Sequence, residues 1–377
     1  MTQSVAIDSA GTHMRRALEL AARGRGAVSP NPLVGAVIAG PNGAVLGEGF
    51  HAELGARHAE VAALADAAER GADVSGATIH ATLEPCAHEG RQPPCTDAIL
   101  ASGIVRVVIG SDDPTEKASG RGPGILRDGG VEVAWAEGPE AAAARLLNQP
   151  FRKRARTGRP WVVLKSALTL DGRTATAGGD SKWISGDESR ELVHRWRADL
   201  DAVGVGIETA LADDALLTSR GVGASRQPTR VVFDSTARLP LDSRLVRTAT
   251  EAPVIVIAGP EAPPANVDGL TNAGIEVVLC AGEGPERARA ALDELGRRDL
   301  ASLMLEGGAT LAGSFRDAGE LDELRIFFAP LLLGGAEARP LLGGDGAARL
   351  RDGERALAVD WEPVGEDMLA RARMREW

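Results

Sequence analysis

Helical and strand patterns alternate along most of the chain, and this alternation decides which folds are open to it. In the first part, short strands at 34–38, 77–82 and 105–109 are separated by helices at 58–70 and 96–102. Alternating strands and helices are typical of α/β domains, in which helices cover a sheet. A chain of 377 residues is too long for one core of ordinary size. We therefore expect two α/β domains.

A cationic stretch bounded by prolines separates the two predicted domains. Within 148–159 it gathers Arg152, Lys153, Arg154, Arg156 and Arg159 without apolar periodicity. We interpret it as a linker between a domain at 1–147 and a domain at 160–377; a nucleic-acid-binding arm is the alternative. In the second domain we expect strands at 160–164, 202–205, 229–234, 254–258, 275–279, 302–305 and 323–328, and helices at 187–199, at 284–297 and from Thr310 onward.

Charge and hydropathy exclude several classes of partner. The net charge is −11, and both halves of the chain carry more acidic than basic residues, which argues against nucleic acid as a partner. Apolar runs are too short to span a membrane, and the N-terminus has no basic-then-apolar pattern. We expect a cytoplasmic enzyme that acts on small molecules, and a homo-oligomer.

The scarce histidines and cysteines are concentrated in the first domain. Five of the six His and two of the three Cys lie before residue 96. His58 and Glu60 open a predicted helix, and Pro85-Cys86 and Pro94-Cys95 follow. A histidine nitrogen and two thiolates suit Zn²⁺ and leave its fourth position to water, as in a catalytic site. We predict His58, Cys86 and Cys95 as zinc ligands.

Glu60 completes the signature of zinc deaminases, which is His-x-Glu followed by Pro-Cys-x-x-Cys. Zinc lowers the pKa of its water, and a nearby carboxylate can carry the proton to a leaving amine. The predicted reaction is hydrolytic loss of ammonia from an amino-substituted ring, with Glu60 as the proton carrier. Here eight residues separate the two Cys, which argues against ordinary cytidine or tRNA adenosine deaminases. An unmetallated pair of buried Cys is the structural alternative.

The inserted loop reads Pro-Cys-x-His-x-Gly-Arg-x-Pro-Pro-Cys over 85–95. Together with Asn31 in Pro-Asn-Pro and His51 seven residues before His58, it closely resembles the bifunctional deaminase/reductase family of riboflavin biosynthesis. The resemblance implies a cytidine-deaminase-like α/β/α domain and a diaminopyrimidinone substrate that carries a phosphoribosylamino group. By position it also implies that four residues bind this substrate: Asn31, His51, His88 and Arg91. His88 and Arg91 suit its phosphate.

The second half extends the resemblance. Lys165-x-Ala-x-Thr-Leu-Asp-Gly-Arg, Ser181-Lys-Trp-Ile, Gly206-x-x-Thr-x-x-x-Asp-Asp and Glu306-Gly-Gly resemble the reductase domain of the same family. This implies a dihydrofolate-reductase-like α/β fold and NADPH as cofactor. It also implies Lys165 and Glu306 as catalytic residues beside the ribose. Implied substrate-binding residues are Ser181, Arg197, Leu217, Arg220 and Glu306. Implied cofactor-binding residues are Ala167, Trp183, Thr209, Asp213, Gly308, Ala309, Thr310, Leu311, Ala312, Gly313 and Ser314.

The residues themselves support nucleotide binding less sharply. The strand at 302–305 runs into a diglycine and then a helix, whose free N–H groups favour an anion. Lys165 is one of four lysines in a chain whose other cations are Arg, and lysine can be desolvated and can donate a proton. A helix entry without a ligand and a strand-end lysine without a function are the plain alternatives. No Gly-x-Gly-x-x-Gly follows the first strand of this domain, which argues against a Rossmann fold.

We predict a zinc-dependent deaminase and NADPH-dependent reductase that acts on phosphorylated pyrimidines. The first step deaminates 2,5-diamino-6-(5-phosphoribosylamino)pyrimidin-4(3H)-one. The second reduces the ribosyl group of the product, 5-amino-6-(5-phosphoribosylamino)uracil, to ribityl. Two alternatives remain: a single-function zinc deaminase with a C-terminal nucleotide-binding module, and a non-enzymatic zinc scaffold. Cys280 has no role in this prediction and is expected in the core.

Overall fold

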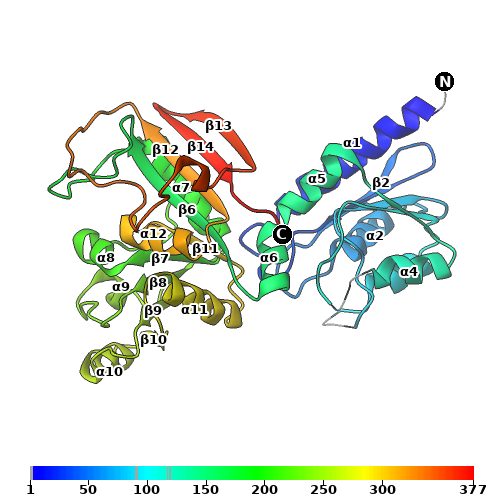
Figure 1. Cartoon of the computed structure of the whole chain (residues 1–377). Helices are drawn as coiled ribbons and strands as arrows, with labels where there is room; N and C mark the ends of the chain where they lie inside the picture. The colour runs from blue at the N-terminus through cyan, green and yellow to red at the C-terminus, as the bar shows by residue number, and fades with distance from the viewer. Residues whose placement is uncertain (1–2, 90–91, 117, 119) are drawn as a thin grey trace. The chain divides into compact units, whose positions relative to one another are not determined.

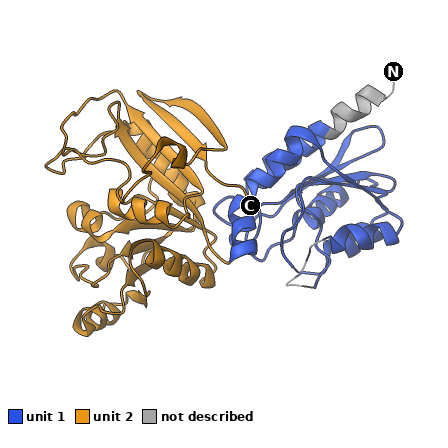
Figure 2. Cartoon of the chain, viewed as in Figure 1, with its two compact units in different colours: residues 1–157, 377 blue, residues 158–376 orange. Residues whose placement is uncertain are grey.

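In the computed structural model the chain folds into two units, each built around its own sheet (Figures 1 and 2). Unit 1 contains residues 1–157 and Trp377, and unit 2 contains residues 158–376. The structure describes residues 3–89, 92–116, 118 and 120–377, and it describes side chains from Gly11 onward. Within these ranges, no helix combines the length and the apolar character that crossing a bilayer requires.

Unit 1 is a five-stranded mixed sheet with helices on both faces. Its strand order is β2 (Val45–Phe50), β1 (Gly35–Ala39), β3 (Thr78–Ala81), β4 (Arg106–Ile109) and β5 (Glu132–Trp135). β1 is antiparallel to both its neighbours, whereas β3, β4 and β5 are parallel. One face packs on α1 (Gln3–Ala22), and α5 (Gly138–Leu147) contacts α1; the other face packs on α2 (Ala59–Glu69), α3 (Cys95–Ala101) and α4 (Arg121–Asp128).

Two glycines on β2 allow α2 to lie directly against the sheet. A Cβ on Gly47 would lie 2.3 Å from the carbonyl oxygen of Ala63, and one on Gly49 would lie 2.3 Å from the backbone nitrogen of the same residue. Any larger residue would push the helix away. The close approach fixes the start of α2, where His58 precedes the helix and Glu60 lies in its first turn.

Unit 2 is a nine-stranded sheet whose first seven strands in spatial order are parallel. The order is β10 (Glu276–Leu279), β9 (Val254–Ala258), β8 (Thr229–Phe233), β7 (Ala202–Gly206), β11 (Ser302–Leu305), β6 (Trp161–Thr169), β12 (Glu323–Ala329), β14 (Asp367–Arg373) and β13 (Ala358–Val364). The helices are α7 (Asp187–Asp199), α8 (Ile207–Asp213), α9 (Arg244–Arg247), α10 (Pro264–Asn272), α11 (Gly284–Arg297) and α12 (Ala309–Asp317), with a 3₁₀ turn at Leu350–Asp352.

The core of unit 2 lies between the central strands and the helices α11 and α12. All residues of β9 and β11 are buried, as expected for parallel strands covered on both faces. Cys280 is buried in this core, as the sequence suggested. The carboxyl ends of these strands meet at one edge of the sheet, where ligands bind in open α/β folds.

The stretch expected as a linker contains a helix, α6 (Gln149–Thr157), which belongs to unit 1. Arg152 and Lys153 are almost fully buried there. The Arg152 guanidinium donates to the carbonyl oxygens of Trp377 and Asp112, at 2.6 and 2.8 Å. A cationic helix of this kind is held by acceptors far away in the chain, which its own pattern does not reveal.

Candidate functional site

The three predicted metal ligands come together in unit 1. His58 immediately precedes α2, Cys86 lies in the loop after β3, and Cys95 is the first residue of α3. His58 Nδ1 lies 3.3 Å from Cys95 Sγ and 3.4 Å from Cys86 Sγ. The ligand atoms of all three residues lie within 4.8 Å of one another. This set of one nitrogen and two sulfurs matches the donors and the spacing that tetrahedral zinc requires.

Protonation of the pair of thiols also fits a metal site. Hydrogen bonds from Cys95 and His58 lower the pKa of Cys86 to about 4, which favours the thiolate that binds a metal. Cys95 holds the proton shared with Cys86, so its own pKa is raised. The Cys95 backbone N–H donates to Cys86 Sγ at 3.3 Å. The residues therefore fit a zinc ion with one open position.

Glu60 lies next to the metal ligands without belonging to them. Its carboxylate is 3% exposed, and Oε2 accepts a hydrogen bond from Cys95 Sγ at 3.4 Å. Burial raises the pKa of Glu60. A buried carboxyl group beside an open metal position is suited to take up and release a proton.

Two of the predicted substrate-binding residues adjoin the metal ligands. Asn31 Nδ2 lies 3.1 Å from His51 Nε2, and His51 Nδ1 lies 3.1 Å from the carbonyl oxygen of Arg57. The His51 ring meets the His58 ring edge to face, with 5.6 Å between centroids. Burial lowers the pKa of His51, which favours its neutral form. Asn31 and His51 thus form one polar wall of the site.

Of the two residues predicted to bind the substrate phosphate, the structure describes His88 but not Arg91. His88 is half-buried, and its Nδ1 is a buried atom with no hydrogen-bond partner among the described residues. Burial raises the pKa of the neighbouring Asp113, and an electrostatic interaction with His88 partly opposes this. Arg91 lies outside the described residues.

In unit 2, Glu306 is held by Arg197 and faces Lys165. Arg197 donates from Nε to Oε1 at 2.7 Å and from Nη2 to Oε2 at 2.8 Å, a bidentate pair. Burial alone would raise the pKa of Glu306, but Arg197 and then Lys165 lower it to about 2. Burial lowers the pKa of Lys165, although the charge of Glu306 partly opposes this. The site holds an ionised carboxylate beside a lysine that loses its proton more easily than usual.

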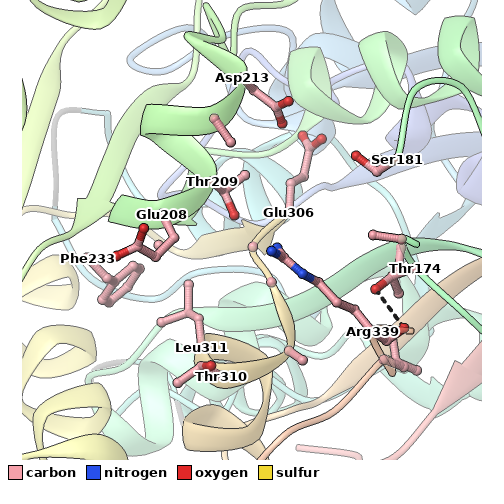
Figure 3. Close-up of a pocket in the computed structure, with 18 of the residues that line it drawn as sticks. Thr174, Ser181, Glu208, Thr209, Asp213, Phe233, Glu306, Thr310, Leu311 and Arg339 are labelled. Carbon is pink, nitrogen blue, oxygen red and sulfur yellow. Dashed lines mark hydrogen bonds between the residues drawn. The ribbon is translucent and has the colours of Figure 1, made fainter. Parts of the chain in front are cut away.

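A cavity of about 1050 Å³ extends from Lys165 and Glu306 along the carboxyl ends of the strands (Figure 3). α12 begins beside it, and among the described residues no side chain caps its first turn, so backbone N–H groups remain available to an anion. Its lining includes most of the predicted reductase residues: Lys165, Ala167, Ser181, Trp183, Thr209, Asp213, Glu306, Gly308, Ala309, Thr310, Leu311 and Ser314. An elongated cavity with an anion-binding helix start fits a dinucleotide.

Five predicted residues lie away from the cavity wall. Ala312 is buried in the core, and a Cβ on Gly313 would lie 2.5 Å from the carbonyl oxygen of Gly343. Leu217 is buried and has a φ of 54°. Arg197 reaches the cavity through Glu306, and Arg220 donates to Thr218 Oγ1 at 3.1 Å.

Several lining residues were not predicted. Lys182 forms an ion pair with Asp213 at 2.9 Å. Ser235 follows β8, Arg287 lies on α11, and Arg339 extends into the cavity from a distant loop (Figure 3). Ser235 could have been found, because it is a polar residue just after a predicted parallel strand. The two arginines gave no local signal in a chain so rich in Arg.

Comparison with known proteins decides the family. A model of the RibD C-terminal domain matches residues 160–369, and a model of the cytidine and deoxycytidylate deaminase zinc-binding region matches residues 8–111. The chain belongs to the RibD family. The Actinobacillus pleuropneumoniae riboflavin biosynthesis protein RibD is 40% identical over 358 residues, covering 95% of this chain and 93% of the relative. The Escherichia coli K12 RibD is 38% identical over 373 residues, covering 94% and 97%.

Solved RibD structures share the whole architecture. Acinetobacter baumannii RibD, form 1, matches with a TM-score of 0.85 and 35% identity, covering 98% of this chain and 100% of that one. A Thermotoga maritima protein matches with a TM-score of 0.83, 34% identity and the same coverage. That protein is described as a diaminohydroxyphosphoribosylaminopyrimidine deaminase and 5-amino-6-(5-phosphoribosylamino)uracil reductase.

Membership of the RibD family confirms the predicted fold and activities. The chain is a deaminase and a reductase of riboflavin biosynthesis, with a zinc-binding deaminase domain. It acts on small phosphorylated pyrimidines. The reductase domain of RibD is related to NADPH-binding reductases, in agreement with the predicted cofactor. The bifunctional prediction is favoured over a single-function deaminase with a binding module.

Proposed function

We propose that the two sites act in sequence on one pyrimidine, each through the residues assigned above. The first removes ammonia from 2,5-diamino-6-(5-phosphoribosylamino)pyrimidin-4(3H)-one. The second reduces the ribosyl group of the resulting 5-amino-6-(5-phosphoribosylamino)uracil. The observation that carries the proposal is the convergence of His58, Cys86 and Cys95 on one point, with Glu60 in contact with Cys95.

In the deaminase site, Glu60 is the proton carrier. When bound by His58, Cys86 and Cys95, zinc supplies Lewis-acid activation of the attacking water. Oε2 of Glu60 accepts a proton from the water and delivers it to the amino group that leaves as ammonia. Burial favours this exchange, because it brings the pKa of the carboxyl group closer to neutrality.

The rest of the deaminase site orients the substrate. Asn31 and His51 are hydrogen-bonded to each other beside His58, and they are placed to hold the pyrimidine ring. His88 offers a buried ring nitrogen that has no hydrogen-bond partner among the described residues, which suits it to bind the substrate phosphate. Arg91 is assigned to the same phosphate from the sequence.

In the reductase site, Lys165 and Glu306 act on the sugar. NADPH supplies the hydride for C1′ of the ribosyl group. Nζ of Lys165 holds a proton for the sugar oxygen, and Glu306, kept ionised by Arg197, orients Lys165 and accepts a hydrogen bond from a sugar hydroxyl. Ser181, the backbone at Leu217 and the cationic Arg220 bind the remainder of the substrate.

The cofactor occupies the long cavity. Ala167 lines the cavity two residues after Lys165 on β6, where the nicotinamide must lie for hydride transfer, and Trp183 lines the cavity as well. The open first turn of α12, from Gly308 to Leu311, receives the diphosphate. Thr209 and Asp213 on α8 also line the cavity.

One assay tests both activities and their order. The zinc-loaded chain is incubated with the diaminopyrimidinone phosphate and NADPH, and ammonia release and NADPH oxidation are followed together. We expect NADPH oxidation to lag behind ammonia release and to depend on it. Oxidation of NADPH before any ammonia appears would overturn the order, and ammonia release without oxidation would overturn the reductase assignment.

Each of the two activities is assigned to one part of the chain. We assign deamination to residues 1–147 and reduction to residues 160–377, with 148–159 as the connection. A homo-oligomeric state, a cytoplasmic location and the absence of nucleic-acid partners remain predictions. Light scattering of the purified chain measures the first, and a gel-shift assay with RNA and DNA measures the last.

A further inference from the structure

The cavity in unit 2 continues well beyond the reacting groups. Lys165 is on β6, and the strand order from there is β11, β7, β8 and β9. The far end is lined by the start of α11, by Asp234 and Ser235 after β8, and by Ile257 in β9. Neighbouring strands lie about 4.8 Å apart, so this end is about 14 to 19 Å across the sheet from Lys165. A ligand reduced or oxidised at Lys165 must be long to reach it.

The middle of the cavity fixes which part of a dinucleotide reaches the far end. Its floor is the uncapped start of α12, which favours a diphosphate. With the nicotinamide beside Lys165 and the diphosphate at α12, the adenosine lies at the ends of β8 and β9. This placement rests on the proposed use of NADPH by the site.

At that far end, Arg287 is placed as a receptor for a second anion. It lies in the first turns of α11, and its side chain is only 11% exposed. Nη1 donates to Ser235 Oγ at 2.5 Å, and Nη2 donates to Glu261 Oε1 at 2.9 Å. Nε is buried and has no hydrogen-bond partner within the described part of the chain. The guanidinium is thus held at the wall with donor capacity to spare.

The other charges at this end leave Arg287 as the cation that faces the ligand. Of the described cationic residues that line the cavity, Lys165, Lys182, Arg190 and Arg339 come from other segments, and Arg287 alone comes from α11. Arg238 lies nearby but outside the lining, where it pairs with Glu208. Glu261 is more than half exposed, so it can swing away and release the guanidinium.

We propose that Arg287 is the residue by which this chain selects NADPH over NADH. Its guanidinium exchanges the carboxylate of Glu261 for the phosphate on the 2′ position of the adenosine ribose, while Ser235 keeps it in place. Phosphate carries more charge than a carboxylate and offers acceptors that match the guanidinium fork. NADH has a hydroxyl at this position and leaves the pair of Arg287 and Glu261 intact.

The test measures binding rather than turnover. Dissociation constants of NADPH and NADH are determined by titration calorimetry on the full-length, zinc-loaded chain and on four variants. Arg287→Gln removes the charge, and we expect it to weaken NADPH about tenfold while the NADH constant stays the same. Arg287→Lys keeps the charge but lacks the planar guanidinium. Its dissociation constant for NADPH should lie between those of the wild type and Arg287→Gln. Glu261→Gln removes the competing carboxylate. It should increase the affinity for NADPH and leave the affinity for NADH unchanged.

Arg238→Gln is the matched control, because it removes a neighbouring cation that lies outside the cavity lining. It should leave the ratio of the two constants unchanged. A loss of NADPH affinity in Arg238→Gln as large as in Arg287→Gln would overturn the assignment of Arg287. Equal weakening of NADPH and NADH in Arg287→Gln would show instead that Arg287 only ties α11 to the ends of β8 and β9.

The wild-type chain separates this inference from the function on which it rests. If it binds neither dinucleotide, the reductase cofactor itself is misassigned. If it prefers NADPH but Arg287→Gln keeps the preference, the proposed function stands and the inference on Arg287 is wrong. Thermal unfolding of each variant shows whether a lost affinity reflects a lost fold.

Discussion

The deaminase site and the reductase site are built on opposite plans. In unit 1, the three metal ligands and Glu60 occupy 38 residues of sequence, and the ligand atoms lie within 4.8 Å. In unit 2, the groups around the cavity come from the ends of parallel strands and from loops between residues 165 and 341. The first site gathers its groups around one point, whereas the second spreads them along a cavity that we propose holds a dinucleotide.

This difference predicts different responses to substitution. Removing one metal ligand should abolish the whole deaminase site, because three donors are the minimum for an open zinc site. Removing one group from the reductase cavity should weaken a single function of that cavity. Each half-reaction can be measured separately by supplying either the diaminopyrimidinone or the deaminated product. The variants below are ordered by expected effect.

The largest loss is expected from Cys86→Ser. A serine hydroxyl does not ionise near neutral pH, so the site loses a thiolate and with it the metal. Zinc content should fall from one per chain to almost none, and ammonia release should stop. Cys280→Ser, which changes a buried cysteine of unit 2, is the control and should keep its zinc. Full zinc content in Cys86→Ser would remove Cys86 from the ligand set.

Glu60→Gln should keep zinc but slow ammonia release about a thousandfold. The amide preserves the shape of the side chain and cannot carry a proton. Metal analysis and an ammonia assay on the same sample separate the two properties, and reduction of the deaminated product should be unchanged. A variant that still deaminates at the wild-type rate would rule out Glu60 as the proton carrier and would favour a purely structural zinc site.

Lys165→Met should lower the kcat of reduction about a hundredfold and leave deamination intact. Lys182→Met, at the other described lysine of the cavity, should alter the KM for NADPH more than kcat, because Lys182 pairs with Asp213. Wild-type kcat should fall as pH rises through the pKa of Lys165, since the protonated form acts. Burial lowers that pKa, so the fall should begin below the range of an ordinary lysine. If kcat of Lys165→Arg falls at the same alkaline pH as kcat of the wild type, deprotonation of Lys165 is not the cause of that fall.

The smallest effect, about tenfold on reduction, is expected from Arg197→Gln. Arg197 holds the pKa of Glu306 at about 2 against the effect of burial. Without Arg197, burial dominates and the pKa rises, so the carboxylate becomes protonated as pH falls toward the acidic range. We expect kcat of the variant to decline on the acidic side where the wild type does not. A pH profile of the same shape in both proteins would mean that Arg197 does not control Glu306.

Much of the architecture followed from local pattern. The helices at 187–199 and 284–297 and the strands at 254–258 and 302–305 have the predicted bounds. Continuous apolar runs and helical spacing are properties of neighbouring residues, which explains this success. The edge strand β13 and its neighbour β14 were not predicted. Most of β13 is exposed and it contains Asp, Glu and Pro, so no apolar alternation marks it.

The local sequence pattern does not predict the partners of the buried arginines. Arg152 in α6 is buried because Trp377 and Asp112 supply acceptors from distant parts of the chain. Arg197 orients Glu306 instead of being solvated. The two residues form a bidentate pair, although more than a hundred residues separate them in the sequence. The partner of a cation is chosen by long-range packing, and the sequence of its own helix does not contain that information.

The sequence by itself determined much of the alternation of helices and strands, gave the two activities through a family resemblance, and singled out His58, Cys86, Cys95 and Glu60 as candidate site residues. This was possible because zinc binds only a few kinds of side chain, and because the hydrophobic periodicity of helices and strands depends on residues that are close together in the sequence. Only the tertiary structure decided that Asn31 meets His51, that Arg197 ionises Glu306 and that Ser235 and Arg287 end the cofactor cavity. These contacts depend on which strand ends and helix starts lie side by side, and that arrangement is set by the packing of the whole sheet.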